Sequence, residues 1–380
     1  MVTLFWLSAL AIAYVYVIYP ALVALLARRR PDPLDRLSVV TSDLDLPAVT
    51  VVISVYNESA RIAAKLANLR ALDYPADRLH IILVSDGSTD DTVARYADEP
   101  GIELIALPQR RGKPHAINTA MARVRSPVTL LMDVRQRTDP DALRQLVRTL
   151  QQPGVGACSG ELTHLEPGSR TAASVGLYWR YERAIRKAES RIDSTVGTTG
   201  ACYALRTELF RPIPEDFILD DFFVPMEIVR QGQRVLLHDG VPVYDELQAE
   251  IAGERTRKIR TLSGNYQAFA RMGWLFDPRR NRVWLQFISH KVMRLLAPWF
   301  LLATLLASAG LAADGSPFHA LAFVLQAAFY LAALAGSLSP GLRKLRLVSL
   351  ATVFTQLNLA AVWGLWRHLA GQTRATWDKT

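Results

Sequence analysis

Four long apolar runs constrain this chain of 380 residues more than any other feature of its sequence. The first extends from Leu4 to Leu26 without a charged residue, close to the roughly 20 residues that a helix needs to cross the hydrocarbon layer. Three more lie near the other end, at about Leu295–Ala313, Phe318–Leu338 and Leu347–Trp366. The pattern predicts membrane-spanning helices at both ends. For the C-terminal runs the alternative is buried core helices. For the first run it is a signal peptide, although such peptides begin with basic residues and here the basic residues follow.

The basic residues near these runs predict an orientation. Basic clusters follow the first run at 28–30, precede the second at 279–294 and separate the third from the fourth at 343–346. Because Lys and Arg stay on the cytoplasmic side during insertion, we expect the long polar segment to be cytoplasmic in a protein of the inner or plasma membrane. Four crossings would leave the basic tail, 367–380, outside. Either the charge bias fails at this end, or one C-terminal run lies in the interface.

Composition narrows the classes of partner. The net charge of +9 could indicate nucleic acid, but much of the excess borders the apolar runs, where anionic lipid is the nearer partner. We therefore expect membrane lipids and no nucleic acid as partners. Cys158 and Cys202 are too few for a disulfide framework and lack the neighbours of a metal site. The predicted division is a transmembrane helix (1–27), a linker (28–47), a soluble domain (48–275), an interfacial amphipathic helix (276–294), about three transmembrane helices (295–366) and a tail (367–380).

The soluble segment alternates short β-branched runs with helical patterns. Predicted strands are Val49–Val55, His80–Val84, Ile102–Ala106 and Val128–Met132; predicted helices are Ala60–Leu72, a helix capped near Ser88 that runs to about Ala97, and Pro114–Val124. Strands of this length without polar alternation suit a sheet buried on both faces. The alternation predicts an α/β fold with a doubly wound, mainly parallel sheet.

Polar residues follow three of the four predicted strands: Tyr56, Asn57 and Glu58; Asp86, Gly87 and Ser88; Asp133, Val134 and Arg135. In open α/β sheets, ligands bind beyond the carboxyl ends of the strands. A single aspartate in such a loop is more often a cap or turn residue. Three sets at the same edge instead predict a ligand site there.

These motifs, in this order, resemble those of glycosyltransferase family 2, the inverting nucleotide-sugar enzymes related to cellulose, chitin and hyaluronan synthases. The resembling segments are Ser54–Glu58, Ser85–Asp90, Gly112-Lys113 with Asn118, Asp133 at the first position of a D-x-D motif, Leu219-Asp220-Asp221 in place of T-E-D, and Arg257–Thr261 as a departed form of Q-R-x-R-W. The resemblance covers nearly the whole chain. It implies a GT-A fold flanked by transmembrane helices, with 48–275 as the catalytic domain.

The family's roles carry over residue by residue. Asp221 would be the catalytic base, with a helix cap as the alternative. The implied donor-binding residues are Tyr56, Asn57, Glu58, Asp86, Lys113, Asp133 and Arg135. On the diphosphate or acceptor side the resemblance implies Gly200, Asp220, Arg257 and Arg260, with Lys258 as a surface charge. The segment Thr195–Ala204 resembles the acceptor-side wall, with a tight turn as its alternative. Two segments that mix aromatic and basic residues, 178–191 and 281–294, are candidates for contact with the membrane surface, although a solvated amphipathic helix suits 178–191 better.

The D-x-D element departs from the family pattern. The resemblance implies a divalent cation, Mg or Mn, held at Asp133, but Arg135 occupies the position of the second aspartate. A guanidinium does not bind a metal ion, and it pairs well with phosphate. Arg135 is thus a candidate to supply positive charge in place of the ion, which puts metal dependence in doubt. A solvated turn is the alternative role for Arg135.

The expected activity is transfer of a sugar from a nucleotide-diphosphate donor, UDP-linked by resemblance, to a polysaccharide or glycolipid acceptor. Other export or synthesis subunits are expected partners of such a transferase. Two alternatives remain open at this point. One is a single addition to a lipid carrier. The other is a catalytically silent subunit that binds nucleotide sugar; Arg135 favours it, whereas Asp221 argues against it.

Overall fold

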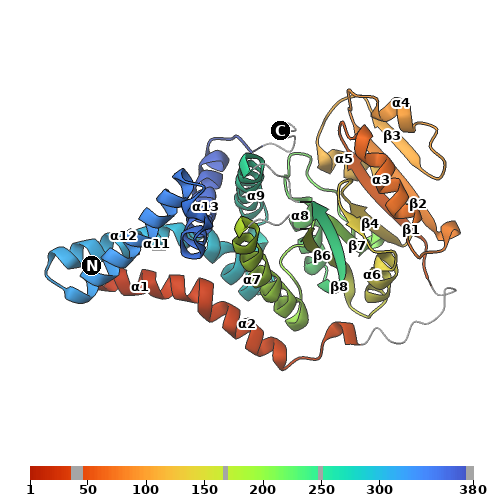
Figure 1. The fold of residues 1–380 in the computed structure, drawn as a ribbon. Helices are drawn as coiled ribbons and strands as arrows, with labels where there is room; N and C mark the ends of the chain where they lie inside the picture. The colour runs from red at the N-terminus through yellow and green to blue at the C-terminus, as the bar shows by residue number, and fades with distance from the viewer. Residues whose placement is uncertain (36–45, 166–169, 247–250, 374–380) are drawn as a thin grey trace.

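The computed structural model describes residues 1–35, 46–165, 170–246 and 251–373. Its α/β part lies at one end of the molecule and its apolar helices at the other (Figure 1). The strands are β1 Val49–Val55, β2 Leu79–Asp86, β3 Glu103–Leu107, β4 Val128–Met132, β5 Arg137–Thr138, β6 Val155–Leu165, β7 Cys202–Arg206 and β8 Arg234–Glu246.

These strands form one sheet in the order β3-β2-β1-β4-β7-β6-β8-β5. The four strands predicted from sequence are mutually parallel. Strand β7 is antiparallel to β4 and β6, β8 is parallel to β6, and β5 is antiparallel to β8. The predicted mainly parallel sheet is confirmed, with an antiparallel addition. Strand β2 is longer than expected because β3 continues to pair with it as far as Asp86 opposite Leu107.

Helices cover both faces of the sheet. They are α3 Ser59–Arg70, α4 Thr92–Tyr96, α5 Lys113–Met121, α6 Ala142–Leu150, α7 Arg170–Ile192, α8 Asp220–Arg230 and α9 Ile251–Arg271. One buried cluster joins α3 and α6 to one face, and a second joins α5 and α8 to the other. Along β1, Val51 and Ile53 face the first cluster and Val52 the second, as the two-residue period of a strand requires.

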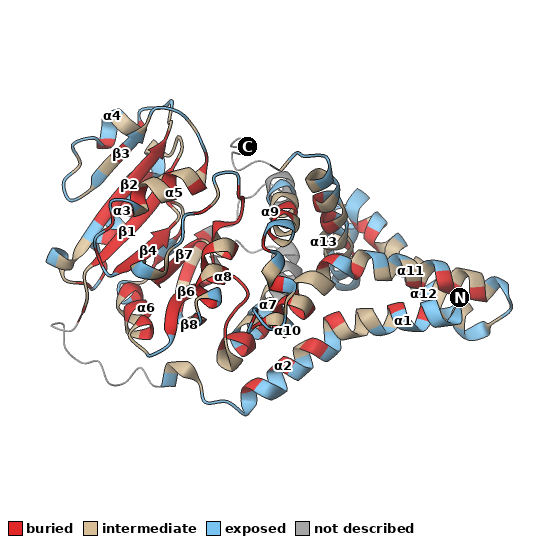
Figure 2. Ribbon diagram, turned by 180° about the vertical axis from the view of Figure 1, so that it is seen from behind, coloured by how far each residue is buried: buried red, intermediate tan, exposed pale blue. Residues whose placement is uncertain are grey.

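The remaining helices are α1 Val2–Ala13, a π-helical turn Tyr14–Ile18, α2 Tyr19–Arg28, α10 Trp284–Gln286, a π-helical segment Phe287–Val292, α11 Met293–Ala313, α12 Pro317–Leu338 and α13 Arg346–Leu369; short 3-10 turns lie at Ala76–Arg78, Thr207–Leu209, Gly273–Phe276 and Leu342–Lys344. Among the described residues, four helical stretches, within 2–35, 284–313, 317–338 and 346–369, are long and apolar enough to cross a membrane. Many of their large apolar side chains are exposed (Figure 2).

The segment predicted as a separate interfacial helix at 276–294 differs from expectation. Its helical part begins at Trp284 and runs on without a break to Ala313. Phe287, Ser289 and His290 within it are buried. This segment is therefore the first part of the second apolar helix, packed against the rest of the protein.

Helix α13 lies differently from the other apolar helices. In both views it stands across the direction of α1, α11 and α12 and runs beside α9 (Figures 1 and 2). Its C-terminal end is held there by stacking of His368 on Tyr266, with ring centroids 6.4 Å apart, and by a 2.8 Å hydrogen bond between the hydroxyls of Ser263 and Thr373. Helix α13 thus contacts the helix that carries Arg257 and Arg260.

Candidate active site

A cavity of about 1160 Å³ opens beyond the carboxyl ends of β1, β2 and β4. It is lined by nearly all of the predicted site residues: Tyr56, Glu58, Asp86, Lys113, Asp133, Arg135, Gly200, Asp220, Asp221, Arg257 and Arg260. Lys258, expected as a surface charge, also lines it, with its ammonium 4.8 Å from the centroid of the Trp179 ring. Residues far apart in sequence therefore meet at one edge of the sheet.

Asn57 is the predicted residue that does not line the cavity. Its φ of 53° lies in the left-handed region, which asparagine tolerates better than most residues. Its side-chain oxygen accepts a 2.8 Å hydrogen bond from the backbone N–H of Thr89. The backbone N–H of Asn57 donates to the Ser88 hydroxyl at 3.1 Å. Asn57 thus fastens the loop after β1 to the loop after β2. Glu58 pairs with Arg61 at 2.7 Å.

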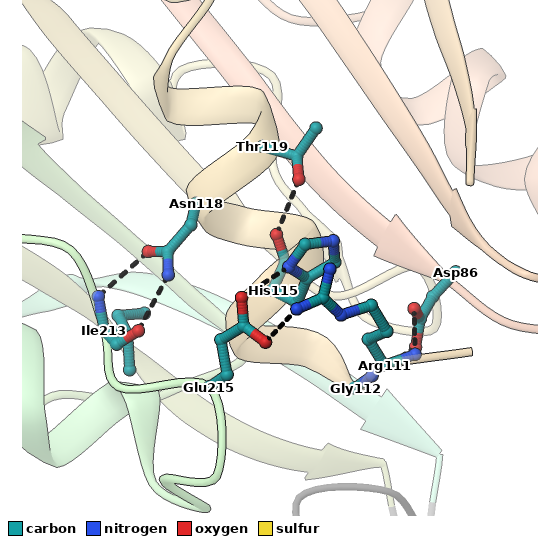
Figure 3. Close-up of polar contacts among 8 residues, drawn as sticks. All are labelled: Asp86, Arg111, Gly112, His115, Asn118, Thr119, Ile213 and Glu215. Atoms are coloured by element: carbon teal, nitrogen blue, oxygen red, sulfur yellow. Dashed lines mark hydrogen bonds and ion pairs between the residues drawn. The ribbon is translucent and has the colours of Figure 1, made fainter. Parts of the chain in front are cut away.

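Asp86 organises the loop that precedes α5. Its two carboxylate oxygens accept hydrogen bonds from the backbone N–H groups of Arg111 and Gly112, both at 2.8 Å (Figure 3). The loop comes so close that a Cβ on Gly87 would lie 2.4 Å from the backbone nitrogen of Arg110. The Arg110 guanidinium in turn lies 3.9 Å from the centroid of the Tyr56 ring. One face of that ring is therefore covered by the loop that Asp86 holds.

A second set of contacts ties α5 to the segment before α8 (Figure 3). The Asn118 side chain donates to the carbonyl of Ile213 at 2.7 Å and accepts from its N–H at 2.9 Å. Glu215 bridges Arg111 and His115. Asn118, part of the motif resembling a donor-binding segment, thus anchors the chain that leads to Asp220 and Asp221.

The two aspartates lie in the first turn of α8, and Leu219 occupies the cap position. Neither carboxylate caps the helix, but both benefit from the positive end of its dipole. The Asp221 carbonyl accepts a 2.8 Å hydrogen bond from the N–H of Thr198. A Cβ at Gly200 would lie 2.7 Å from Oδ2 of Asp221. Glycine is therefore required at 200 for the Asp221 carboxylate to occupy its place.

The electrostatics distinguish the two aspartates. The Lys113 ammonium lies 2.9 Å from Oδ1 of Asp133 and 3.1 Å from Oδ2 of Asp220. Burial opposes its charge, but these two carboxylates outweigh burial and hold the pKa of Lys113 well above its usual value. Burial and the adjacent Asp220 carboxylate raise the pKa of Asp221 to about 6. Asp221 is thus poised to exchange a proton near neutral pH.

Arg135 contacts a partner that the sequence did not indicate. Its Nη2 lies 2.7 Å from Oδ2 of Asp245, whose side chain is only 7% exposed. Asp245 comes from β8, which pairs with β5 just after Arg135. Because Asp245 neutralises part of its positive charge, Arg135 would bind a phosphate less strongly than an unpaired arginine would.

The residues present allow a divalent cation only in a limited way. Within the described ranges no three His, Cys, Asp or Glu side chains converge as a metal site. Asp133 offers one carboxylate, which Lys113 already contacts, and Arg135 supplies no ligand. Mg or Mn prefers several oxygen ligands. The donor set thus fits an ion that takes most of its oxygens from a bound diphosphate.

The cavity also has a wall that the motifs did not reveal. On this wall burial lowers the pKa of Arg260 and has the larger effect, whereas Asp220 and Asp221, which interact electrostatically with its guanidinium, raise that pKa. Arg186 and Lys291 line the same cavity. They belong to the two segments that mix aromatic and basic residues. That mixture was the sequence signal that could have indicated these two residues. Helix α7 is not a solvated helix, because it packs against α2 with Ile185 and Ala188 buried.

Comparison with known proteins matches this geometry. Residues 50–213 match the family model for glycosyl transferase family 2. An N-acetylglucosaminyltransferase of Rhizobium sp. (strain N33) is 31% identical over 199 residues, 47% of this chain and 44% of that protein. A poly-β-1,6-N-acetyl-D-glucosamine synthase of Staphylococcus aureus is 23% identical over 240 residues, 60% of this chain and 57% of that protein. The chain spans about half the length of these curated relatives.

A solved structure covers almost the whole chain. The mannosyltransferase PcManGT of Pyrobaculum calidifontis, in complex with GDP-Man and Mn²⁺, has a TM-score of 0.72 and 25% identity, covering 96% of this chain and 99% of that one. Residues 50–213 are therefore similar to glycosyltransferase family 2, and the chain has the GT-A fold. The described residues also include helices long and apolar enough to cross a membrane.

Proposed function

We propose that this protein is a glycosyltransferase that inverts the anomeric configuration of the sugar it transfers, and that Asp221 is the base. The supporting observation is the position of Asp221: a buried carboxylate with a raised pKa, set against Gly200 in the same cavity as Asp86, Lys113 and Asp133. A module that only bound nucleotide sugar would have no use for such a group.

The proposed reaction needs one base and several cations. Asp221 takes the proton of an acceptor hydroxyl, the oxygen forms a bond to the anomeric carbon, and the bond from that carbon to the diphosphate breaks on the opposite face. A positioned base typically contributes about 100- to 10,000-fold. Lys113 and Arg260 stabilise the charge that develops on the diphosphate. Mg or Mn, when bound, would act as a Lewis acid on the diphosphate, and Asp133 is the residue that would hold it.

The donor is proposed as a nucleoside-diphosphate sugar that lies between Tyr56, Asp86 and Lys113. The curated relatives are named for N-acetylglucosamine transfer and polymerisation, whereas the solved mannosyltransferase was captured with GDP-Man. UDP-N-acetylglucosamine is our first choice, in keeping with the UDP-linked donor expected from sequence. The acceptor is proposed to be a polysaccharide or a glycolipid at the membrane.

Helix α13 supports a topology that reconciles all of the basic clusters. If α1 with α2, α11 and α12 cross the membrane and α13 lies in the interface beside α9, the clusters at 28–30 and 343–346 and the tail at 367–380 all face the cytoplasm. The catalytic part then lies on the same side. Cysteine accessibility at 374–380 in intact cells tests this arrangement, and labelling from outside would overturn it.

The test of function is nucleotide release by the purified full chain with a panel of UDP- and GDP-sugars, with and without Mg or Mn. We expect release that depends on one sugar and one nucleotide, together with an inverted product. Absence of release with every donor, together with tight nucleotide-sugar binding, would instead indicate the silent subunit.

A further inference from the structure

The cavity does not end at Asp221 but continues between the apolar helices. Beyond the charged residues its lining includes Leu350, Val353 and Leu357 of α13 and Leu295 of α11. Both helices are long and apolar enough to cross a membrane. This part, the apolar arm, thus joins the proposed base to side chains of α11 and α13 within one cavity.

At the junction between the base and the apolar arm, Glu182 and His290 line the cavity, and Glu189 of α7 is buried in contact with His290. Glu189 accepts hydrogen bonds from the Tyr19 hydroxyl at 2.5 Å and from Nδ1 of His290 at 2.8 Å. Glu182 contacts Nε2 of His290 at 2.5 Å and also pairs with Arg294. Oε2 of Glu189 has no hydrogen-bond partner among the described residues, and both glutamates also attract Arg186 and Lys291 electrostatically.

Two cations at the same junction retain unused donors. Nη1 of Arg186 donates to the Thr199 hydroxyl at 3.2 Å, whereas its Nη2 is buried and has no hydrogen-bond partner in the part of the chain that the structure describes. Lys291 lines the cavity, and within those residues no hydrogen bond or ion pair engages its ammonium. Both cations act electrostatically on Asp221.

Buried donors without partners are costly, and two cations beside a cavity fit an anion. A phosphate suits them because it presents several oxygens to guanidinium and ammonium groups. A free sugar chain would offer these N–H donors no ionic acceptor, and it would gain little from the leucines and valine of the apolar arm. The combination indicates an amphiphile with an anionic head.

We propose that Arg186 and Lys291 bind the phosphate of a lipid acceptor whose apolar chain lies along α13 and whose head-group hydroxyl lies at Asp221. This inference rests on the proposed function, since the hydroxyl loses its proton to Asp221 as the bond to the anomeric carbon forms and the diphosphate leaves. It names the acceptor class: a hydroxyl-bearing anionic lipid.

The first test is lipid retention, measured by native mass spectrometry of the detergent-purified full chain with phosphatidylglycerol added. We expect Arg186→Gln and Lys291→Gln each to reduce retention about tenfold or more. Lys187→Gln is the matched control, because Lys187 is the next residue on α7 and pairs with Asp239 away from the cavity; it should retain lipid like the wild type. Diacylglycerol and glycerol phosphate, which each lack one half of the ligand, should bind weakly to all four proteins.

The second test is nucleotide release in vesicles that contain phosphatidylglycerol, compared with slow release to water in neutral detergent. We expect the Arg186 and Lys291 variants to lose stimulation by lipid, and Lys187→Gln to keep both the stimulation and the slow release to water. This inference would be overturned if both variants retained lipid and responded to it as the control does. If release still depended on Asp221, the proposed function would remain intact. Selective lipid retention without any release would instead remove the proposed function and keep the lipid site. Preferential elongation of soluble oligosaccharide, unaffected by either variant, would indicate a polymer acceptor and overturn the inference.

Discussion

Replacing Asp221 with asparagine should make the protein both less active and more stable. Asparagine has almost the same shape, so its side chain keeps its place against Gly200, but it cannot take a proton. We expect transfer to fall by about 100- to 10,000-fold, the usual contribution of a positioned base. The wild-type rate should fall as the pH drops through about 6, where the carboxylate becomes protonated, and the residual rate of the variant should lack this inflection.

The gain in stability follows from the same pKa. The folded protein raises the pKa of Asp221 from its ordinary value of 3.8 to about 6, so it binds this proton more tightly than the unfolded chain does. Below pH 3.8 the group is protonated in both states and contributes no difference. As the pH rises to about 6, stability is lost, by up to roughly 3 kcal/mol at about 1.4 kcal/mol for each tenfold change in proton affinity.

The assay is thermal unfolding in detergent across pH, with initial rates of nucleotide release measured on the same samples. The Asp221→Asn variant should unfold at a higher temperature than the wild type at pH 7.5 or so, and the difference should vanish below pH 3.8. Asp77→Asn, at an exposed aspartate outside the cavity, should change neither quantity. Full turnover by Asp221→Asn would refute the assignment of the base, and a stability difference independent of pH would refute the electrostatic argument.

Three further predictions concern other parts of the site. Gly200→Ala should lower kcat by at least about tenfold because its Cβ would displace the Asp221 carboxylate, whereas Gly273→Ala, with open space around it, should leave kcat unchanged; equal rates would show that the close approach is unimportant. Arg135→Met should destabilise the protein by about 3 kcal/mol, because it leaves the Asp245 charge buried without its partner. Thermal or chemical unfolding measures this loss, and adding Asp245→Leu should restore most of it; additive losses would contradict the argument. Mn²⁺ titrated calorimetrically should bind with the nucleoside diphosphate but not alone, since Asp133 is the carboxylate available at this position; tight binding to the nucleotide-free protein would contradict the proposed donor set.

Much of the fold could be predicted from local patterns. The β-branched runs of β1 and β4 are found with the predicted bounds, because a strand buried on both faces leaves a continuous apolar signature. The rule that ligands lie beyond the carboxyl ends of parallel strands placed Tyr56, Asp86 and Asp133 at one cavity before any coordinates were known. The roles of these residues in binding and catalysis stay predictions.

The contacts that sequence could not indicate all join distant segments. Arg135 and Asp245 are 110 residues apart. They meet because β5 pairs with β8, and β5, with only two residues, is too short to leave a sequence pattern. Asn118 reaches Ile213, 95 residues further on, and a side chain that binds backbone leaves no motif at its target. The mixture of aromatic and basic residues around Lys291 predicts a position at the membrane surface, and only tertiary packing places Lys291 in the lining of the cavity.

The packing of α13 on α9 makes catalysis sensitive to the bilayer itself. Stacking of His368 on Tyr266 joins the two helices one to two turns of α9 beyond Arg260, whose guanidinium senses the aspartates of the site. Helix α13 is proposed to lie in the membrane interface, where lipid packing and curvature set how deeply such a helix sits, and α9 would move with it. The distance between Arg260 and the departing diphosphate would then depend on the membrane surface, so the rate of sugar transfer should change with vesicle curvature when the lipid composition is held constant.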